Sequence, residues 1–357
     1  MAGLGPELTV APAAGARQPA AAASEPDGEG AAPRPTNPEL AGDGLVRREG
    51  RALGSPLRLS MRAREGSVDD AWSAVQDVFS QVDRAMSRFR DDSELTLLAR
   101  HAPSPMLGVS RMLVRALSAA DRARRVTDGR FEPRIVTALE RIGYAAASQG
   151  SLVNGAPSPT RGRVLEHDHR LGSVRLTEPV DLGGIGKGLA LRWAADAIAA
   201  SLALAAAPAA ETGFLLDAGG DIVVDGTPAA GEPWHIGIEN PAGGSTPVAT
   251  LRASGRFAVA TSSTRRLRWV QAGRMVHHLI DPRTGEPGGA GLVAVTVAGP
   301  DPAWAEVWSK ALFLEGSAGI AALARSRGMT AWWVTSDGDL EMTAAARART
   351  VWVSAET

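Results

Sequence analysis

Hydrophobic positions recur along this chain with two spacings, and each spacing predicts one kind of element. Leu57, Leu59 and Met61 alternate with polar residues, which is typical of a strand with one buried face. Over residues 71–89, apolar side chains recur at steps of three and four, which predicts an amphipathic helix that stops at 90–93. A second helix of this kind is predicted from about Ser110 to 127–129. Between them, Ser93 before Glu94 fits the start of a helix, so capping is its expected role.

Short apolar runs dominate the middle of the chain and predict strands. They lie at 174–176, 214–216, 222–224, 234–238, 249–251 and 256–260. Several end at Gly, Asp or Pro, which predicts hairpins and a mostly antiparallel sheet. Further on, the pattern predicts a strand at 293–298, helices at 302–315 and 317–326, and a hairpin of 331–335 with 340–342. Helices grouped early and late around antiparallel strands indicate the α+β class.

Composition divides the chain into a tail and a folded part. Residues 1–43 consist mainly of Ala, Pro, Gly and Glu with few large apolar side chains, so we expect a disordered tail. The pattern changes at residue 44, and 44–357 are expected to fold. Within that part, 145–163 are rich in Ser, Gly and Pro and predict a surface loop.

Charge and cysteine content exclude several classes of function. A net charge of −1 over 357 residues gives no reason to expect nucleic acid or an anionic membrane as partner. The absence of cysteine excludes disulfides, thiolate metal sites and cysteine nucleophiles. No membrane-spanning segment is expected, because the alanine-rich run at 189–207 contains Arg192 and Asp196. The first residues lack a basic region followed by an apolar core, so a cytoplasmic location is expected.

A glycine-rich turn at 181–188, DLGGIGKG, is the strongest candidate for ligand binding. Its glycines allow a ligand close to the backbone, and the helix that follows would present its positive end to a phosphate. It is not a Walker A loop, because Gly188 follows Lys187 where Ser or Thr is needed. It is not a dinucleotide fingerprint either, because Leu189 stands at the third glycine position. A strand-to-helix turn with an exposed lysine remains the alternative.

Four further clusters place polar residues next to apolar runs. The segment 217–221, DAGGD, favours a hairpin but also suits contact between backbone and ligand. Hydroxyls at 261–264 fit phosphate binding or capping. The segment 277–285 suits proton transfer or ligand orientation by a histidine, and only weakly a metal site. Glu306 and Lys310 share one face of the predicted helix, where they fit an intrahelical ion pair.

Six segments, taken in their order along the chain, resemble the ApbE family of FAD:protein FMN transferases. They are SRFRDDSEL at 87–95, DGRFEP at 128–133, DLGGIGKG at 181–188, GGD at 219–221, ATS at 260–262 and HLIDPRTG at 278–285. DLGGIGKG and HLIDPRTG in combination are specific to that family, and the resemblance extends over about 53–343. It implies one flavin transferase domain over 44–357, with mostly antiparallel sheets, flanking helices and an ApbE-like (T-fold-like) architecture.

The resemblance also implies an activity and a set of site residues. A family member binds FAD, transfers FMN to a threonine hydroxyl of an acceptor protein in a magnesium-dependent reaction, and releases AMP. Catalytic roles then fall on His278, Asp281 and Lys187. Binding of FAD falls on a larger set that shares these segments, namely Phe89, Arg130, Phe131, Glu132, Asp181, Lys187, Gly220, Thr261, Ser262, His278 and Ile280.

The implied metal site is where this chain departs from the family. The family holds Mg²⁺ with a backbone oxygen of the glycine loop, here at Gly184, and with an Asp and a Thr that correspond to Glu306 and Lys310. Glutamate offers oxygen to a hard cation, whereas an ammonium has no lone pair. Phe89 stands where a tyrosine is usual and Glu132 where an aspartate is usual.

Three hypotheses follow for the function. In the first, the chain is an active FMN transferase, with metal held by Gly184, Glu306 and either Asp301 or substrate phosphates, or with Lys310 neutralising phosphate charge. In the second, it is a carrier that binds FAD without catalysis, motivated by Lys310. In the third, it is an FAD pyrophosphatase that uses water as the acceptor and gives FMN and AMP.

Overall fold

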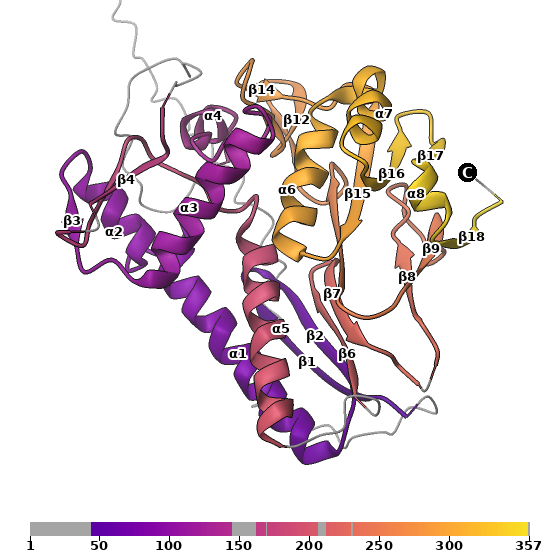
Figure 1. Cartoon of the computed structure of the whole chain (residues 1–357). Coiled ribbons are helices and arrows are strands. Elements are labelled where there is room, and N and C mark those ends of the chain that lie inside the picture. The colour runs from indigo at the N-terminus through magenta and orange to yellow at the C-terminus, as the bar shows by residue number, and fades with distance from the viewer. Residues whose placement is uncertain (1–43, 145–161, 169, 206–211, 230, 356–357) are drawn as a thin grey trace, which may run out of the picture. The chain divides into compact units, whose positions relative to one another are not determined.

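The apolar strand segments assemble into one large antiparallel sheet. The structure, a computed structural model, describes residues 44–144, 162–168, 170–205, 212–229 and 231–355, all within the unit Pro38–Thr357 (Figure 1). Eight strands form the large sheet in the order β1-β2-β6-β7-β10-β15-β16-β17. Their bounds are Val46–Ala52, Ser55–Arg62, Gly213–Ala218, Asp221–Gly226, Phe257–Ser263, Leu292–Gly299, Thr330–Thr335 and Leu340–Met342. Every adjacent pair is antiparallel.

Alternating side chains give this sheet two buried faces. In β10, Ala258 packs with the helices while Val259 packs with the small sheet β18-β9-β8. Trp332 of β16 lies on the same face as Val259 and is fully buried. The small sheet consists of β8 (Trp234–Ile238), β9 (Ala249–Ala253) and β18 (Thr350–Val353). Because successive side chains point to opposite faces, one sheet supports two cores.

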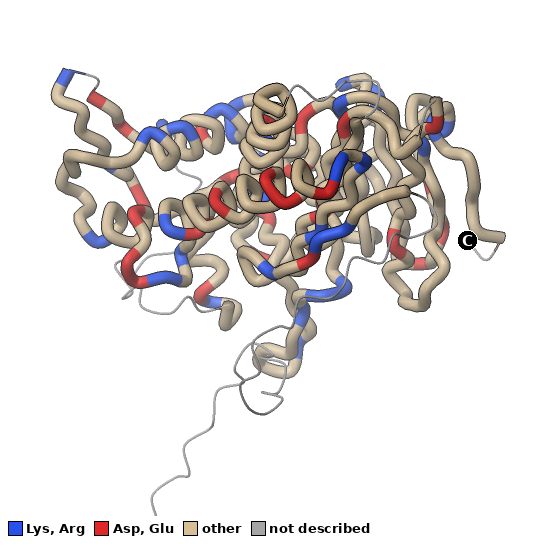
Figure 2. The backbone as a smooth tube through the Cα atoms, turned by 90° about the horizontal axis from the view of Figure 1, so that it is seen from below, with Lys and Arg blue, Asp and Glu red and all other residues tan. Residues whose placement is uncertain are grey.

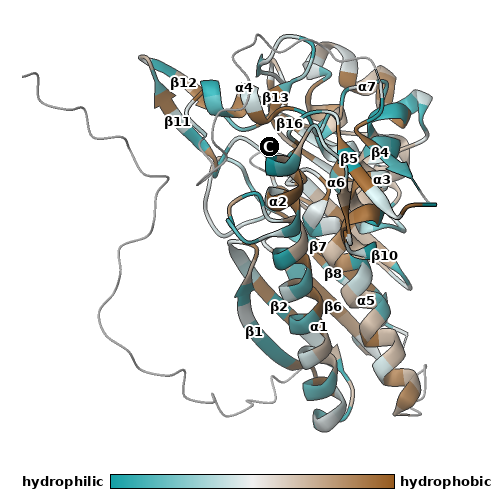
Figure 3. Cartoon of the chain, turned by 90° about the vertical axis from the view of Figure 1, so that its left-hand side faces the viewer, coloured by the Kyte–Doolittle hydropathy of each residue, from teal (hydrophilic) through white to brown (hydrophobic). Residues whose placement is uncertain are grey.

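Helices cover the other face. The long helices α1 (Glu65–Met86) and α5 (Gly186–Leu204) lie side by side, as Figures 1 and 3 show, and bury a shared apolar surface against β2 and β6. Helix α6 (Pro302–Phe313) packs on α5, β10 and β15, and α7 (Gly316–Ser326) follows it. The amino-terminal ends of α5 and α6 therefore come together beside β7 and β10.

Smaller elements surround this frame. They are α2 (Glu94–His101), β3 (Met106–Leu107), α3 (Arg111–Val126), α4 (Val136–Arg141), β4 (Leu165–Asp168), β5 (Ser173–Leu176), β11 (Arg268–Gln271), β12 (Arg274–His277), β13 (Ile280–Asp281), β14 (Glu286–Pro287) and α8 (Ala344–Arg347). Strands β3, β5 and β4 form one sheet, whereas β11-β12 and β13-β14 are two-stranded.

The predicted class and most predicted elements are confirmed. The sheets are antiparallel with flanking helices, and the segment 217–221 contains the turn of the β6-β7 hairpin, which is made by Gly219 and Gly220 at positive φ. Ser93 caps α2 by accepting from the Thr96 N–H at 3.1 Å. The predicted tail at 1–43 and the loop residues 145–161 lie outside the described residues.

One predicted helix boundary is wrong, and several elements, strand β1 among them, were not predicted. The first helix ends at Met86, and Phe89 lies outside it with 52% of its surface exposed, because Ser87 is extended and its carbonyl accepts the Ser93 hydroxyl at 2.5 Å. Strand β1 was not expected, because its residues are mostly charged. It forms because its backbone pairs with β2 through a tight turn.

Charge is spread over the described residues. In Figure 2, positive and negative residues are interspersed along the backbone, in agreement with the net charge of −1. Among the helices that the structure describes, none combines the length and the apolarity that crossing a membrane requires.

Candidate functional site

The glycine loop ends in a helix that lacks a cap of its own. Asp181 Oδ1 accepts the Gly183 N–H at 2.5 Å, and α5 begins at Gly186 without a side-chain cap from Ile185. The first N–H groups of a helix have no partner within it. One of them, on Gly188, donates to Glu306 Oε2 of α6 at 2.8 Å. A carboxylate from a helix distant in the sequence therefore caps α5 and joins its start to α6.

Gly188 is required by close packing at this junction. A Cβ atom on it would lie 2.5 Å from Ala303 Cα and 2.6 Å from the Pro302 carbonyl oxygen. Only glycine fits this approach of α5 to α6, which aims the beginnings of both helices at the same place.

Two lysines and two carboxylates meet next to this junction. The Lys187 ammonium contacts Asp221 Oδ2 and lies 3.9 Å from Glu306 Oε1. Lys310 lies 3.3 Å from that Glu306 oxygen, and Asp221 Oδ1 accepts the Thr261 N–H at 3.1 Å. Burial lowers the pKa of Lys187, the Lys310 charge lowers it further, and Glu306 opposes both. Strands β7 and β10 and helices α5 and α6 each contribute to this cluster.

The predicted hydroxyl pair divides between the two faces of β10. The Ser262 hydroxyl is buried and bonds to that of Ser309 on α6 at 2.8 Å. The Thr261 hydroxyl bonds to that of Thr296 on β15 at 2.9 Å. Neighbouring residues of a strand point to opposite faces, so a ligand that contacts one of these side chains does not reach the other from the same side.

An aromatic group lies beside Asp181. The Arg88 Nε atom lies 2.7 Å from Asp181 Oδ2, and its guanidinium faces the ring of Phe89 at 4.6 Å and that of Tyr144 at 5.0 Å. Tyr144 meets Phe89 edge-on at 6.1 Å and stacks on Trp269 at 5.6 Å. Burial, together with the Asp181 charge, raises the pKa of Tyr144, so its phenol is neutral at neutral pH.

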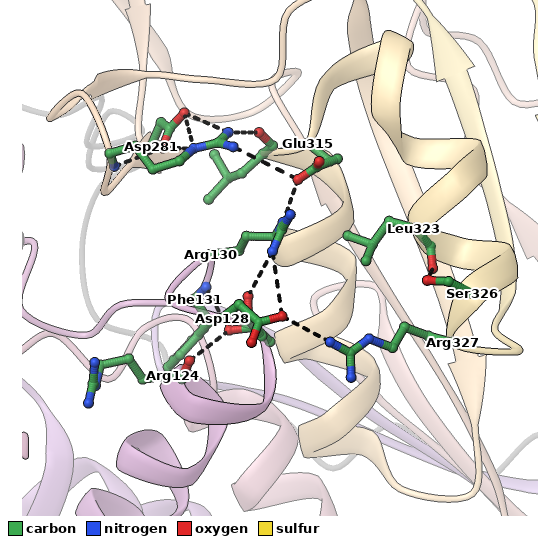
Figure 4. A network of polar contacts seen from close by, with 12 residues as sticks. Arg124, Asp128, Arg130, Phe131, Asp281, Glu315, Leu323, Ser326 and Arg327 are labelled. Carbon is green, nitrogen blue, oxygen red and sulfur yellow. Dashed lines mark hydrogen bonds and ion pairs between the residues drawn. The ribbon is translucent and has the colours of Figure 1, made fainter.

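The turn at 130–133 divides between the loop and a separate network. Phe131 is buried against Gly184, where a Cβ atom would lie 2.8 Å from its ring. Glu132 is held by Arg134 at 2.8 Å. Arg130 contacts Glu315 and bonds to the Thr127 carbonyl at 3.3 Å, within the network of Figure 4. The contact between Arg130 and Glu315 lowers the pKa of Glu315 and raises that of Arg130.

The segment 278–285 holds one histidine near the lysines and one carboxylate in a turn. Burial, the Lys310 charge and other neighbours lower the pKa of His278 to about 3, so its ring is neutral. Its Nδ1 atom lies 3.4 Å from the Leu267 carbonyl. Asp281 is paired with the Arg283 guanidinium at 2.9 Å and accepts the Arg283 N–H. Ile280 is buried in a small cluster with α4, so its side chain serves packing.

The structure brings most of the expected residues together, but not all. Gly220 lies in the turn after β6 and donates to Asp217 at 2.7 Å, and the Asp217 charge opposes the burial that lowers the pKa of Lys187. Asp301 caps α6 and pairs with Arg192 at 2.6 Å, so its carboxylate is already engaged.

Comparison with known proteins identifies the family. The sequence profile of the ApbE family matches residues 53–333. This chain belongs to the ApbE family. A Vibrio cholerae protein named FAD:protein FMN transferase is 26% identical over 261 residues, which cover 71% of this chain and 76% of that relative. A Klebsiella pneumoniae protein of the same name is 27% identical over 306 residues, covering 83% and 91%.

Solved ApbE structures share the fold. The ApbE protein of Thermotoga maritima matches with a TM-score of 0.74 and 23% identity, over 85% of this chain and 99% of that chain. The apo form of the flavinyl transferase ApbE of Pseudomonas stutzeri matches with a TM-score of 0.71 and 23% identity, over 85% and 96%.

The residues at the expected ApbE metal position do not fit Mg²⁺. Both Glu306 oxygens are engaged, one by the Gly188 N–H and the other by Lys310. The Lys310 stem lies against Gly184, with Cδ and Cε at 3.2 and 3.3 Å from a Cβ atom built there. Mg²⁺ needs near-octahedral oxygen ligands, and an ammonium supplies none. Within the described residues, no three His, Cys, Asp or Glu side chains form a metal-binding group.

The sequence analysis missed several residues of this candidate site. Arg88, Tyr144 and Trp269 were not singled out, although Tyr144 is the one tyrosine of the sequence. A single tyrosine that follows a glycine and precedes a predicted loop was the available signal for Tyr144. Ser309 and Thr296 were missed because nothing local marks a serine in a helix or a threonine in a strand as the partner of a distant hydroxyl.

Proposed function

We propose that this chain transfers FMN from FAD to a threonine hydroxyl of an acceptor protein and releases AMP. The observation that carries the proposal is that the ammonium groups of Lys187 and Lys310 lie at one end of the glycine loop 181–188, whereas the aromatic group lies beside Asp181 at the other end. A cationic helix end suits a pyrophosphate, and aromatic faces suit a flavin ring. Family membership and the names of the relatives agree with this arrangement.

The reaction is a displacement at phosphorus. The threonine oxygen forms a bond to the FMN phosphorus, and the bond from this phosphorus to the bridging oxygen breaks. AMP leaves with that oxygen, and FMN remains on the acceptor through a phosphodiester. Such reactions depend mainly on positioning and on neutralisation of charge on the phosphate oxygens. We assign the neutralising role to Lys187, which Asp221 holds in place.

We assign the threonine proton to His278. Its ring is neutral, so one nitrogen has a free lone pair. A pKa of about 3 makes a weak base in the free protein, with burial as the largest cause and the Lys310 charge as the next. Negative phosphate oxygens placed beside Lys310 and Lys187 offset that charge and raise the basicity of the ring. Asp281 as a catalytic residue stays a prediction, and its contacts with Arg283 are those of a residue that positions the turn.

We assign the flavin ring to the aromatic group. Phe89 is more than half exposed, and Tyr144 and Trp269 extend the apolar surface beside it. Arg88 lies under two of these rings and fixes Asp181. The cytoplasmic location expected from the sequence stays a prediction.

The test is direct. Purified protein is incubated with FAD and a threonine-containing acceptor domain from a flavinylated protein, and AMP and the acceptor mass are measured. We expect AMP together with a mass gain equal to bound FMN, and no gain on an acceptor whose threonine is replaced by alanine. AMP and free FMN without acceptor modification would establish a pyrophosphatase instead. Bound FAD without AMP would establish a carrier.

A variant of Lys187 tests whether the measured activity comes from this site and not from a contaminating enzyme. Lys187→Met removes the ammonium beside Asp221 and should lower the rate by roughly 10²–10³, as loss of one preorganised donor does. An unchanged rate in this variant would place the chemistry elsewhere.

A further inference from the structure

The two lysines of the chain meet at one carboxylate. Lys187 and Lys310 are the only lysines in the sequence, and the other fixed cationic side chains are arginines. Both Nζ atoms face Glu306 Oε1, at 3.9 and 3.3 Å. An ammonium is a compact point charge, whereas a guanidinium is a planar fork. The chain therefore has its compact cations at this site alone.

Lys310 is placed by its stem as well as by its charge. Its aliphatic carbons pass along Gly184, and the Phe131 ring closes the other side of that glycine. Four-fifths of the Lys310 side chain is buried, and Glu306 is 1% exposed. The ammonium is thus fixed beside the glycine loop by packing and by one ion pair.

Glu306 is saturated by protein donors. Its Oε2 atom caps α5 through Gly188, and its Oε1 atom faces the two ammonium groups. A divalent ion bound there would have to displace Lys310 and would lie next to a second positive charge on Lys187. Repulsion between like charges in a buried site opposes that exchange.

The fixed groups supply positive charge without an added ion. Lys187 and Lys310 contribute two ammonium groups, and the amino-terminal end of α5 contributes about half an elementary charge. Asp221 and Glu306 carry the two opposing negative charges and hold the ammonium groups in place. All three positive groups are in place before substrate arrives, which is the condition for efficient electrostatic stabilisation.

We propose that the Lys310 ammonium takes the place of a divalent cation at the FAD pyrophosphate, so that this chain transfers FMN without bound Mg²⁺. The proposal rests on the proposed function and goes further, because it assigns Lys310 direct contact with the phosphate oxygens. No bond to Lys310 forms or breaks, and its ammonium keeps its protons throughout.

The first experiment compares transfer rates in excess EDTA and in Mg²⁺. A metal-dependent site loses several kcal/mol of stabilisation without its ion, which is roughly a thousandfold or more in rate. We expect the rates to agree within about twofold, because the preorganised charges belong to the protein. Activity that is lost in EDTA and restored by Mg²⁺ would overturn the proposal while leaving the proposed function intact.

Variants at position 310 test the residue itself. Lys310→Met keeps the length of the stem and removes the charge, and it should lower kcat by roughly 10²–10³. Lys310→Arg keeps the charge and is the matched control, which should retain more activity. The double variant Glu306→Asp/Lys310→Thr removes the ammonium and should make transfer depend on Mg²⁺. Equal activity of Lys310→Met and wild type at saturating FAD would overturn the proposal. A loss of activity in Lys310→Met that is fully explained by a smaller folded fraction, as its melting temperature shows, would overturn it as well.

A binding experiment decides the question even if no transfer is seen. With ¹³C-labelled lysine, the protein gives side-chain signals from two residues, and Lys310→Arg assigns them. Added FAD in EDTA should shift the Lys310 signal, and Mn²⁺ with FAD should give no protein-bound signal in electron paramagnetic resonance. Bound Mn²⁺ near Lys310, or a Lys310 signal that FAD leaves unmoved, would overturn the proposal. Absence of AMP in every condition would count against the proposed function instead.

Discussion

The Arg88 Nε atom lies 2.7 Å from Asp181 Oδ2, and the Arg88 side chain is only 2% exposed. This ion pair connects the end of α1 to the glycine loop, and Arg88 also faces the rings of Phe89 and Tyr144. A buried pair holds two segments together because neither charge tolerates the loss of its partner.

Asp181→Asn should therefore destabilise the fold strongly. The change leaves the Arg88 guanidinium buried without a counter-charge, which costs about 3–5 kcal/mol. Asp91→Asn is the control, because Asp91 pairs with Arg100 at 2.7 Å on the surface and its loss should cost less than about 1 kcal/mol. Urea unfolding measures both. Equal midpoints for the two variants would contradict the role given to the buried pair.

Gly188→Ala should disrupt the contact between α5 and α6. The new methyl group would lie 2.5 Å from Ala303 Cα, and such overpacking costs about 1–3 kcal/mol. Gly186→Ala in the same turn meets only Met86 Cε at 3.5 Å, an ordinary contact, and should be neutral or slightly stabilising. Thermal unfolding of the two variants makes the comparison, and a Gly188→Ala protein as stable as Gly186→Ala would refute the packing argument.

The stability of the folded protein should fall as the pH drops below about 6.5, the ordinary pKa of histidine, because of His278. His278 has a pKa of about 3 in the folded protein and about 6.5 when unfolded. Between these values the unfolded chain binds the extra proton, so the free energy of unfolding decreases as pH falls from about 6.5 toward 3. The loss of melting temperature between neutral and acidic buffer should be smaller in His278→Gln. His101→Gln, at an exposed position, should behave as wild type.

Tyr144→Ala should weaken FAD binding if the aromatic group holds the flavin ring. Stacking on an aromatic side chain contributes about 1–3 kcal/mol per base in nucleic-acid complexes, which indicates roughly a five- to 150-fold loss of affinity. Tyr144→Phe keeps the ring and should bind nearly as well, because the phenol is neutral in the folded protein. Titration followed by flavin fluorescence distinguishes them. Similar affinity for Tyr144→Ala and wild type would show that the flavin ring does not stack on Tyr144.

Local pattern predicted the elements well because helices and hairpins are decided by neighbouring residues. The hairpin at 217–221 follows from two glycines between apolar strands, and both adopt positive φ. The end of α1 was misplaced because Phe89 continues the apolar period, while the contact of Ser93 with Ser87 that ends the regular structure is not periodic.

The site was predictable only in part, for a different reason. The glycine motif marked Lys187 and the predicted helix at 302–315 marked Glu306, but the contact between these two residues depends on how α5 meets α6. Asp281 was predicted as a catalytic residue because it is a carboxylate in the segment 278–285, yet its carboxylate accepts a hydrogen bond from Arg283, two residues away. Tyr144 belongs to no motif, and its place beside Asp181 follows from the tertiary fold alone.

The hydrogen bond from Gly188 to Glu306 joins residues 118 positions apart, and Arg130 and Glu315 are 185 apart. Contacts between distant segments require closure of long loops and form slowly. Helical signal should therefore return early during refolding, while the ability to bind FAD returns in a later phase that tracks the docking of α6 on α5. A newly made chain would pass through a stage in which most of its helices are formed but the binding site is not. FAD would not bind the chain at that stage and would not stabilise it. Flavin supply would then act on the finished protein and leave its rate of folding unchanged.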